Sequence, residues 1–348
     1  MFSILRPYIF SLDPEVAHDL AIKSLKANIL PKSFFNVSDE AMLETNLFNK
    51  KISNPIGLAA GFDKSAEVYN SLFKFGFGFI EVGTVTPKQQ FGNPKPRVFR
   101  LEKDQALINR LGFNNDGLEV ISKRISDNYP DGFLGMNVGP NKETKNKEED
   151  YYICLSKLPS HVGYITINIS SPNTEGLRNF HDQDEMKKLL IGLNKIKKKK
   201  KIDQPIAIKI SPDINVKEIG RIVELVKSQN IQGIIVSNTT DSSRENLSDI
   251  KKNEIGGLSG QPMKDISTKL IKKFYKETKG EVKIIGVGGV DSGKSAFEKI
   301  TAGADAVQLY TGMVYKGPGI VKEIKKELIS ILKKENFKNI GEAVGINA

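Results

Sequence analysis

The sequence predicts an α/β fold, a TIM (β/α)8 barrel with a small N-terminal helical domain. Three observations lead to it: eight short runs rich in apolar and β-branched residues, amphipathic segments between them, and polar residues directly after each run. In such a barrel, ligands bind where the strands end. A doubly wound open sheet is the competing fold, but its Gly-x-Gly-x-x-Gly sequence does not follow the first run. The predicted strands are residues 56–60, 79–82, 134–138, 164–169, 206–210, 233–236, 283–287 and 306–309.

Residues 1–45 are predicted to form the helical domain, and residues 46–348 the barrel. Asp13 followed by Pro14 is typical of a helix start, because the carboxylate caps free N–H groups and proline fits the first turn. Apolar residues then follow at helical spacing until Pro31 interrupts them. Two hypotheses fit this segment: a cap packed on the barrel, or an amphipathic module that lies in a membrane interface. The residues alone favour the cap.

Two later segments are predicted to be helices that cover the barrel. Residues 216–229 place Ile219, Val223 and Val226 on one face, and the segment after Pro318 repeats apolar residues every four positions. Asp291 or Ser292 is expected to cap another helix.

Composition excludes several classes of protein. The net charge of +11 comes mostly from lysines in solvated segments, and no basic-aromatic pattern accompanies them, so nucleic-acid binding is not expected. The single cysteine, Cys154, excludes an intramolecular disulfide and lies on an apolar helix face; the three histidines lack metal-ligand spacing. No metal site is predicted. Without an apolar run near ~20 residues or a signal peptide, an intracellular bacterial-type protein is expected.

The central stretch of the chain is residues 164–178, an alternating strand that ends in a polar loop at Ser171 and Pro172. The other strand ends are also rich in Lys, Asn, Ser and Thr, without an acidic or histidine cluster. This pattern argues against metal catalysis and against a Ser-His-Asp triad. It predicts a site for a small polar ligand.

Glycine-rich ends of the last two strands point to a phosphate. GVGGVDSG (286–293) and YTG (310–312) follow strands seven and eight, where barrels commonly bind phosphate through backbone N–H groups. Alone, GVGG fits a glycine turn equally well. Two insertions interrupt the alternation: residues 86–116, predicted to form a hairpin over the strand ends, and residues 239–262. Their length predicts a functional role.

Longer motifs resemble those of one family, the membrane-associated, quinone-dependent (class 2) dihydroorotate dehydrogenases. The resemblance implies a TIM barrel, one FMN per chain, and oxidation of dihydroorotate to orotate in pyrimidine synthesis. The matching motifs run through the chain in family order: LDPEVAH (12–18), NPIGLAAGFDK (54–64), EVGTVTPKQQFGNPKPRVFRL (81–101), NRLGFNNDG (109–117), NVGPNK (137–142), NISSPNTEGLR (168–178), SNTT (237–240), GGLSGQP (256–262), IIGVGGVDSG (284–293) and YTGMVYKGP (310–318).

The resemblance also implies roles for individual residues. Ser171 matches the catalytic base, a position that is cysteine in the cytosolic classes; a serine base needs activation by a desolvated site or a water relay. Lys209 would lie near the flavin pyrimidine edge. Ser237 stands where relatives have threonine, which keeps the hydroxyl. The implied substrate residues are Lys64, Asn109, Arg110, Leu111, Gly112, Phe113, Asn168, Asn173, Asn238 and Thr239. The implied FMN residues are Ala60, Gly61, Phe62, Asp63, Lys64, Thr84, Asn137, Asn168, Lys209, Ser237, Gly260, Gly289, Tyr310 and Thr311.

For the N-terminal domain, the resemblance implies attachment to the membrane and a tunnel that leads ubiquinone or menaquinone to the flavin. His18, Arg100 and Tyr315 are candidates for its lining. A monomer at the cytoplasmic face of the bacterial inner membrane is expected. Two alternatives stay open. One is a dihydrouridine synthase acting on tRNA, although the cysteine acid of such enzymes is absent from residues 168–178. The other is a non-catalytic phosphate-binding barrel or membrane scaffold.

Overall fold

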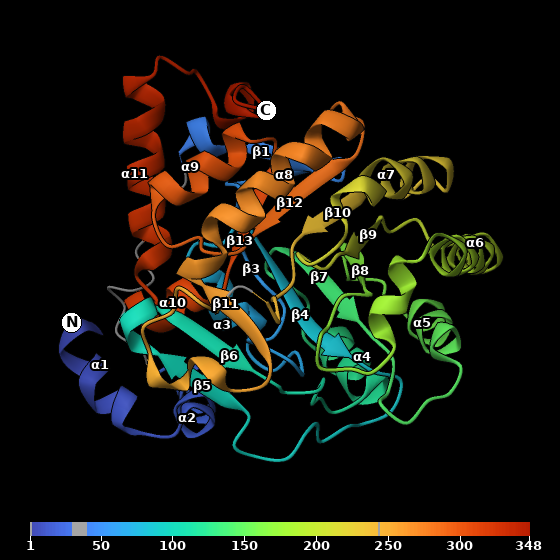
Figure 1. Ribbon diagram of the computed structural model, residues 1–348, viewed down its shortest axis with the longest axis horizontal. Helices are drawn as coiled ribbons and strands as arrows, with labels where there is room; N and C mark the ends of the chain where they lie inside the picture. Colours follow the sequence, from blue (N-terminus) through green and yellow to red (C-terminus); the bar gives the residue numbers. More distant parts are fainter. Residues whose placement is uncertain (1, 30–39, 243) are drawn as a thin grey trace.

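The computed structural model describes residues 2–29, 40–242 and 244–348. Eight parallel strands close into a barrel, in which the last strand pairs with the first, and helices surround it (Figure 1). Each strand overlaps one predicted run, so the TIM barrel is confirmed. In barrel order the strands are β3 (Ile56–Leu58), β4 (Phe79–Val85), β7 (Phe133–Val138), β8 (Tyr164–Asn168), β9 (Ile206–Lys209), β10 (Gly233–Val236), β12 (Lys283–Val287) and β13 (Ala306–Leu309).

The outer helices bury the apolar faces that their sequences predict. α7 buries Ile219, Val223 and Val226, and α11 buries the residues that recur after Pro318. Ser292 caps α9 in a reciprocal arrangement with Ser295, as expected. The helices are α3 (Tyr69–Phe73), α4 (Leu118–Asp127), α5 (Lys147–Ser156), α6 (Gln183–Lys200), α7 (Ile219–Ser228), α8 (Lys264–Thr278), α9 (Gly293–Thr301), α10 (Thr311–Lys316) and α11 (Ile320–Lys334). Short 3-10 helices are η2 (Ala41–Leu43), η3 (Glu102–Asp104), η4 (Leu177–His181), η5 (Val216–Glu218), η6 (Ile250–Asn253), η7 (Gln261–Met263) and η8 (Ile340–Ala343).

A hairpin covers the end of the barrel at which the strands begin. β1 (Thr45–Leu47) and β2 (Lys50–Ile52) are antiparallel. Leu47, Phe48 and Ile52 pack against buried barrel residues such as Phe79 and Tyr164. The end of the barrel without the ligand site is therefore filled with apolar side chains. The hairpin covers them, and so removes their apolar surface from water.

The opposite end carries a three-stranded sheet. β5 (Val98–Leu101) and β6 (Ala106–Asn109) form the hairpin predicted within the first insertion. β11 (Gly257–Gly260), from the second insertion, pairs with β6 in an antiparallel register, a pairing that no local sequence pattern predicts. Both insertions thus build one structure over the strand ends of the barrel.

Two N-terminal helices, α1 (Phe2–Ser11) and α2 (Pro14–Lys26), lie beside this sheet (Figure 1). The Asp13 carboxylate accepts the backbone N–H groups of Glu15 and Val16, so the predicted N-cap is confirmed. Arg97 holds α2 through a two-pronged ion pair with Glu15 at 2.9–3.1 Å. Pro31, where an interruption is expected, lies outside the described residues. No helix within those residues is long and apolar enough to cross a membrane.

Candidate active site

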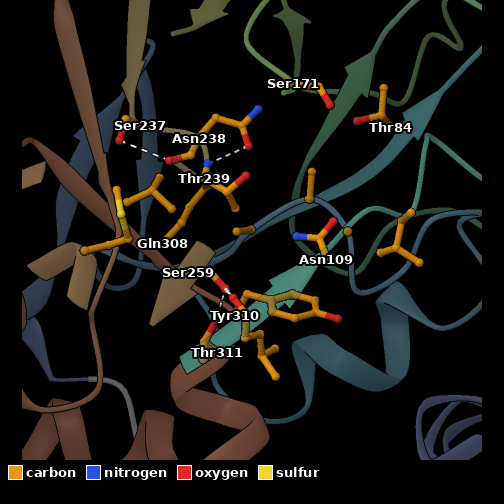
Figure 2. Close-up of a pocket in the computed structure, with 18 of the residues that line it drawn as sticks. Thr84, Asn109, Ser171, Ser237, Asn238, Thr239, Ser259, Gln308, Tyr310 and Thr311 are labelled. Atoms are coloured by element: carbon orange, nitrogen blue, oxygen red, sulfur yellow. Dashed lines mark hydrogen bonds between the residues drawn. The ribbon is translucent and has the colours of Figure 1, made fainter. Parts of the chain in front are cut away.

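The largest group of predicted site residues lies around one cavity, which we call the main cavity. It occupies about 1180 Å³, partly open to solvent, between the C-terminal ends of the barrel strands and the sheet of β5, β6 and β11 (Figure 2). The predicted residues that line it are Ala60, Gly61, Lys64, Thr84, Asn109, Leu111, Gly112, Phe113, Asn168, Ser171, Asn173, Lys209, Ser237, Asn238, Thr239, Gly260, Gly289, Tyr310 and Thr311.

Ser171 is positioned by the loop that follows β8. Its side chain is buried, and its Oγ accepts the backbone N–H of Asn173 at 3.2 Å. Asn173 in turn donates through Nδ2 to the backbone carbonyl of Asn109 at 3.1 Å. The loop after β8 is therefore joined to β6, and the Ser171 hydroxyl is held in a desolvated place beside two amides.

A network of side-chain amides orients the neighbouring strand ends. Asn238 donates to Asn168 Oδ1 at 3.2 Å and to Ser170 Oγ at 2.9 Å. Asn168 donates to Thr84 Oγ1 and to Asn137 Oδ1, both at 3.2 Å. Because an amide both donates and accepts, such a network can hold a planar polar ring in one orientation.

The barrel interior beneath the cavity is polar. The buried carboxylate of Glu81 accepts hydrogen bonds from Asn137, Tyr164, Thr166 and Gln308 at 2.8–3.1 Å. Burial, followed by the charge of Glu81, raises the pKa of Tyr164. Gln308 lines the main cavity, and its Oε1 is buried without a hydrogen-bond partner among the residues that the structure describes. An orphaned buried acceptor indicates that a donor from a bound molecule belongs there.

Two lysines bring positive charge to the cavity. Lys209 is buried; desolvation lowers its pKa, and the charge of Glu81 opposes that shift. Desolvation lowers the pKa of Lys64 to about 8, and the charge of Glu15 opposes it. Neither ammonium takes part in an ion pair or side-chain hydrogen bond among the described residues. Both are therefore available to anionic or electron-rich groups of a ligand.

One side of the cavity is built from glycine backbone. A Cβ at Gly260 would lie 2.4 Å from the carbonyl oxygen of Gln105, and one at Gly289 would lie 2.6–2.8 Å from Lys264. Both glycines have positive φ, +98° and +70°, which L residues rarely adopt. Ser259 and Thr311 share a hydrogen bond of 2.9 Å between them (Figure 2). Glycine backbone and hydroxyls of this kind suit a phosphate.

The comparison with known proteins identifies the family. The family model described as dihydroorotate dehydrogenase matches residues 42–332. The chain belongs to the dihydroorotate dehydrogenase family. The resemblance inferred from its sequence motifs is thereby confirmed, and the barrel that carries the main cavity is the fold of that family.

Similar proteins cover nearly the whole chain. A protein named dihydroorotate dehydrogenase (quinone) from Bartonella tribocorum is 45% identical over 340 residues, covering 96% of this chain and 93% of its own. A protein of the same name from Christiangramia forsetii is 45% identical over 336 residues, covering 94% and 98%. A crystal structure of DHODH from Eimeria tenella in complex with ferulenol superposes with a TM-score of 0.92 at 38% identity, covering 96% of each chain.

Four of the residues expected from the family resemblance do not line the main cavity. Asn137 lies beneath it and hydrogen-bonds to Thr84 at 2.7 Å. Arg110 points to Glu254 on the outer side of the sheet, at 2.9 Å. Asp63 caps backbone N–H groups of Glu67 and Val68, and burial raises its pKa to about 6. Phe62 packs between His18 and Tyr310. Their parts in a site remain predictions.

A second cavity, which we call the α2 cavity, lies between α2 and the barrel. It occupies about 990 Å³, open in part, and shares Lys64 and Asn114 with the main cavity. His18 lines it, and burial lowers the pKa of this imidazole to about 3. The other two tunnel candidates hold α1 in place: Arg100 donates to the carbonyls of Phe10 and Leu12 at 3.1 and 2.9 Å, and Tyr315 packs edge-on against Phe10.

Several lining residues were absent from the sequence-based prediction. Ser259 and Asn114 lie inside motifs that the sequence displays, so the motifs could have led to them. No motif pointed to Gln308. It is a single polar residue within an apolar strand, and the sequence does not indicate that its side chain lines a cavity. Val287, Gly288, Val290 and Gly312 lie in the two glycine-rich stretches expected to bind phosphate, although they were not singled out there. The remaining lining residues that were not predicted are Ala59, Val98, Leu107, Met263 and Leu309.

Proposed function

We propose that this chain oxidises dihydroorotate to orotate, with one FMN per chain as the hydride acceptor and a membrane quinone as the final acceptor. The proposal depends on one observation: the Ser171 side chain and four side-chain amides line the same cavity. The amides belong to Asn109, Asn168, Asn173 and Asn238. Family membership supports the same activity. Orotate offers a carboxylate together with ring N–H and C=O groups, which amides and a lysine can bind.

In the reaction, two C–H bonds of the dihydropyrimidine break and a C=C bond forms. Ser171 Oγ takes up the proton from one of these bonds while its own hydroxyl proton passes to water, and bound FMN would supply the acceptor for the hydride. The Asn173 N–H donates to Ser171 Oγ and stabilises the negative charge that builds on that oxygen as its own proton leaves, and the buried position keeps the hydroxyl from bulk water. Lys64 pairs with the substrate carboxylate, and the amides fix the ring.

The residues around the main cavity fit FMN. The unpartnered Gln308 Oε1 and the free ammonium of Lys209 lie where a polar ring edge can satisfy them. Gly260, Gly289 and Thr311 would hold the phosphate through backbone N–H groups and a hydroxyl. Ala60, Thr84 and Ser237 would line the ring. The lysine would stabilise negative charge on the reduced flavin, the electronic tuning that a protein contributes to a cofactor.

For the acceptor side, we propose that residues 1–45 form a separate module at the membrane surface, on the cytoplasmic face of the bacterial inner membrane. Apolar side chains of α1 and α2 face solvent: Ile4 is 72% exposed, Tyr8 74% and Leu20 47%. A row of such residues is costly in water and suits a lipid interface. We place the path for ubiquinone or menaquinone between these helices and the barrel, where the α2 cavity shares Lys64 with the main cavity. The enzyme would act as a monomer.

The alternatives receive less support. A dihydrouridine synthase needs a cysteine acid in the loop after β8, whereas Cys154 is buried in α5, where burial raises its thiol pKa. A scaffold that binds phosphate does not need Ser171 and four amides around one cavity. Family membership also favours the pyrimidine substrate.

Anaerobic mixing of the purified yellow protein with dihydroorotate tests the proposal. We expect the flavin absorbance to bleach, and a ubiquinone analogue, but not fumarate, to restore it. A colourless protein would support the scaffold. A flavoprotein that dihydroorotate leaves oxidised would overturn the proposed substrate, and recovery with fumarate alone would overturn the proposed acceptor.

A further inference from the structure

Lys299 is a buried cation in α9. Its side chain has 0% exposure, and its Nζ donates to the carbonyl of Lys264 at 3.0 Å, to Thr268 Oγ1 at 2.9 Å and to Ser267 Oγ. All three acceptors are neutral. None of the ion pairs among the described residues includes Lys299. Burying an ammonium without an anion is costly, so a counter-charge is expected from elsewhere.

The position of Lys299 indicates where that counter-charge would lie. Its Cδ would be 3.4 Å from a Cβ at Gly286, and its partner Ser267 donates to the carbonyl of Gly288 at 3.3 Å. Gly289 packs on the backbone of Lys264, whose carbonyl accepts from Lys299. The ammonium therefore lies behind the strand end 286–289, of which residues 287–289 line the main cavity on its glycine-rich side.

The charged groups around Lys299 do not neutralise it directly. Glu298 and Asp265 favour its charged form, and the ammonium of Lys264 disfavours it. Both carboxylates are within ion-pair distance of Lys264, at 3.4 and 3.8 Å. Desolvation exceeds these effects and lowers the pKa of Lys299 to about 7.

We propose that Lys299 is the buried counter-charge for the phosphate of the bound flavin nucleotide, acting through the Ser267–Gly288 contact and across the glycine backbone. This inference rests on the proposed function, because it takes FMN as the ligand of the main cavity. A phosphate dianion on the cavity side of the loop favours the protonated amine behind it. By linkage, FMN binding near neutral pH draws a proton onto Lys299, and the protonated amine tightens FMN binding.

The test uses the full-length chain freed of flavin and titrated with FMN or with riboflavin, which lacks the phosphate. In Lys299→Met we expect the Kd of FMN to rise about tenfold, the size of one partly screened charge contact, while that of riboflavin changes less than about twofold. Lys294→Met, an exposed lysine of the same helix, is the matched control and is expected to leave both constants unchanged. Ser267→Ala removes the hydrogen-bonded link but keeps the charge.

Proton uptake provides a second readout, which is measured on the wild-type chain and assigned with Lys299→Met. Calorimetric titration of the wild-type chain with FMN at pH 8, in buffers of different ionisation enthalpy, is expected to report uptake of a fraction of a proton, which riboflavin does not cause. Lys64 also titrates near this pH, so loss of the uptake in Lys299→Met assigns it. Equal effects of Lys299→Met on FMN and riboflavin, no effect on either, or no proton uptake would overturn the inference. Failure of the wild-type chain to bind FMN would instead refute the proposed function.

Discussion

Arg178 donates to the carboxylate of Asp213 at 3.0 Å and so joins the loop after β8 to the loop after β9. The same guanidinium donates to Asp241 at 2.9 Å, and to the backbone carbonyl of Ser170 at 3.4 Å. Ser170 directly precedes the proposed base. The loop that carries Ser171 is thus held by a planar cation with several donors, a geometry that lysine cannot reproduce.

Replacing Arg178 with Gln is expected to lower the kcat of dihydroorotate oxidation about tenfold or more, because small displacements of a reacting group are costly in rate. Binding of FMN should stay unchanged. Added guanidinium should restore part of the rate if Arg178 acts by positioning. Arg124→Gln is the control, since Arg124 also pairs with a carboxylate, Asp116 at 2.7 Å, and with a backbone carbonyl. Equal losses in both variants would indicate a general loss of stability.

Ser171→Ala is expected to keep FMN bound and to slow flavin reduction by dihydroorotate about 10²–10⁴-fold, the range that a general base contributes. Stopped-flow absorbance measures this step separately from quinone reduction, which should be unaffected. Ser171→Cys is the matched variant, because it keeps a group that can accept a proton. Unchanged flavin reduction in Ser171→Ala would remove Ser171 from the role of base.

Orotate binding is expected to weaken as the pH rises through about 8, the pKa of Lys64. The sign follows from the charge: below this pH the ammonium can pair with the orotate carboxylate, and above it the amine is neutral. Difference spectra of the flavin between pH 6.5 and 9 give the dissociation constant. Lys64→Met should bind weakly at every pH. A wild-type affinity that does not vary with pH would contradict the assignment.

Glu15→Gln is expected to loosen α2, since it leaves the buried Arg97 without its carboxylate, a change worth on the order of 1–3 kcal/mol for a hydrogen-bonded charge. Quinone turnover should fall and trypsin should cut the N-terminal helices faster. Loss of the Glu15 charge also lowers the pKa of Lys64 further and so weakens substrate binding, but flavin reduction by saturating dihydroorotate should change little. Glu119→Gln, at an exposed position of α4, serves as the control. Parallel loss of both half-reactions would argue against a separate quinone module.

We expect the contact that His18 makes between α2 and the barrel to weaken in acid. Its imidazole packs on Phe62 at 5.0 Å between ring centroids, and its pKa is lowered to about 3 by burial. The imidazole of His18 binds a proton more readily in the unfolded chain than in the folded one. Protonation therefore favours unfolding, and the folded state loses free energy of stabilisation as the pH falls from the ordinary histidine pKa of about 6.5 toward 3. The melting temperature of wild-type protein should therefore drop between pH 7 and 5 more than that of His18→Asn. Parallel curves would refute this.

Local sequence determined the barrel and much of the candidate site. Each strand is a short apolar run, such as residues 233–236, and period and composition suffice to find it. The motif around Ser171 and the glycines at 288 and 289 also lie within single short stretches. Their placement at strand ends follows from the barrel fold itself, since all eight strands run in one direction.

Tertiary structure alone decided the rest, because it depends on contacts between residues far apart in the chain. The pairing of β11 with β6 joins Gly260 to Ala106, and Gln308 on β13 donates to Glu81 on β4, two strands away in the barrel. Arg110 lies within a matching motif yet turns outward to Glu254. In the sequence, Lys299 cannot be distinguished from the other lysines of a basic chain. Only the packing of α9 against α8 buries it. A buried charge acquires its partners only when the chain folds, and no local pattern records them.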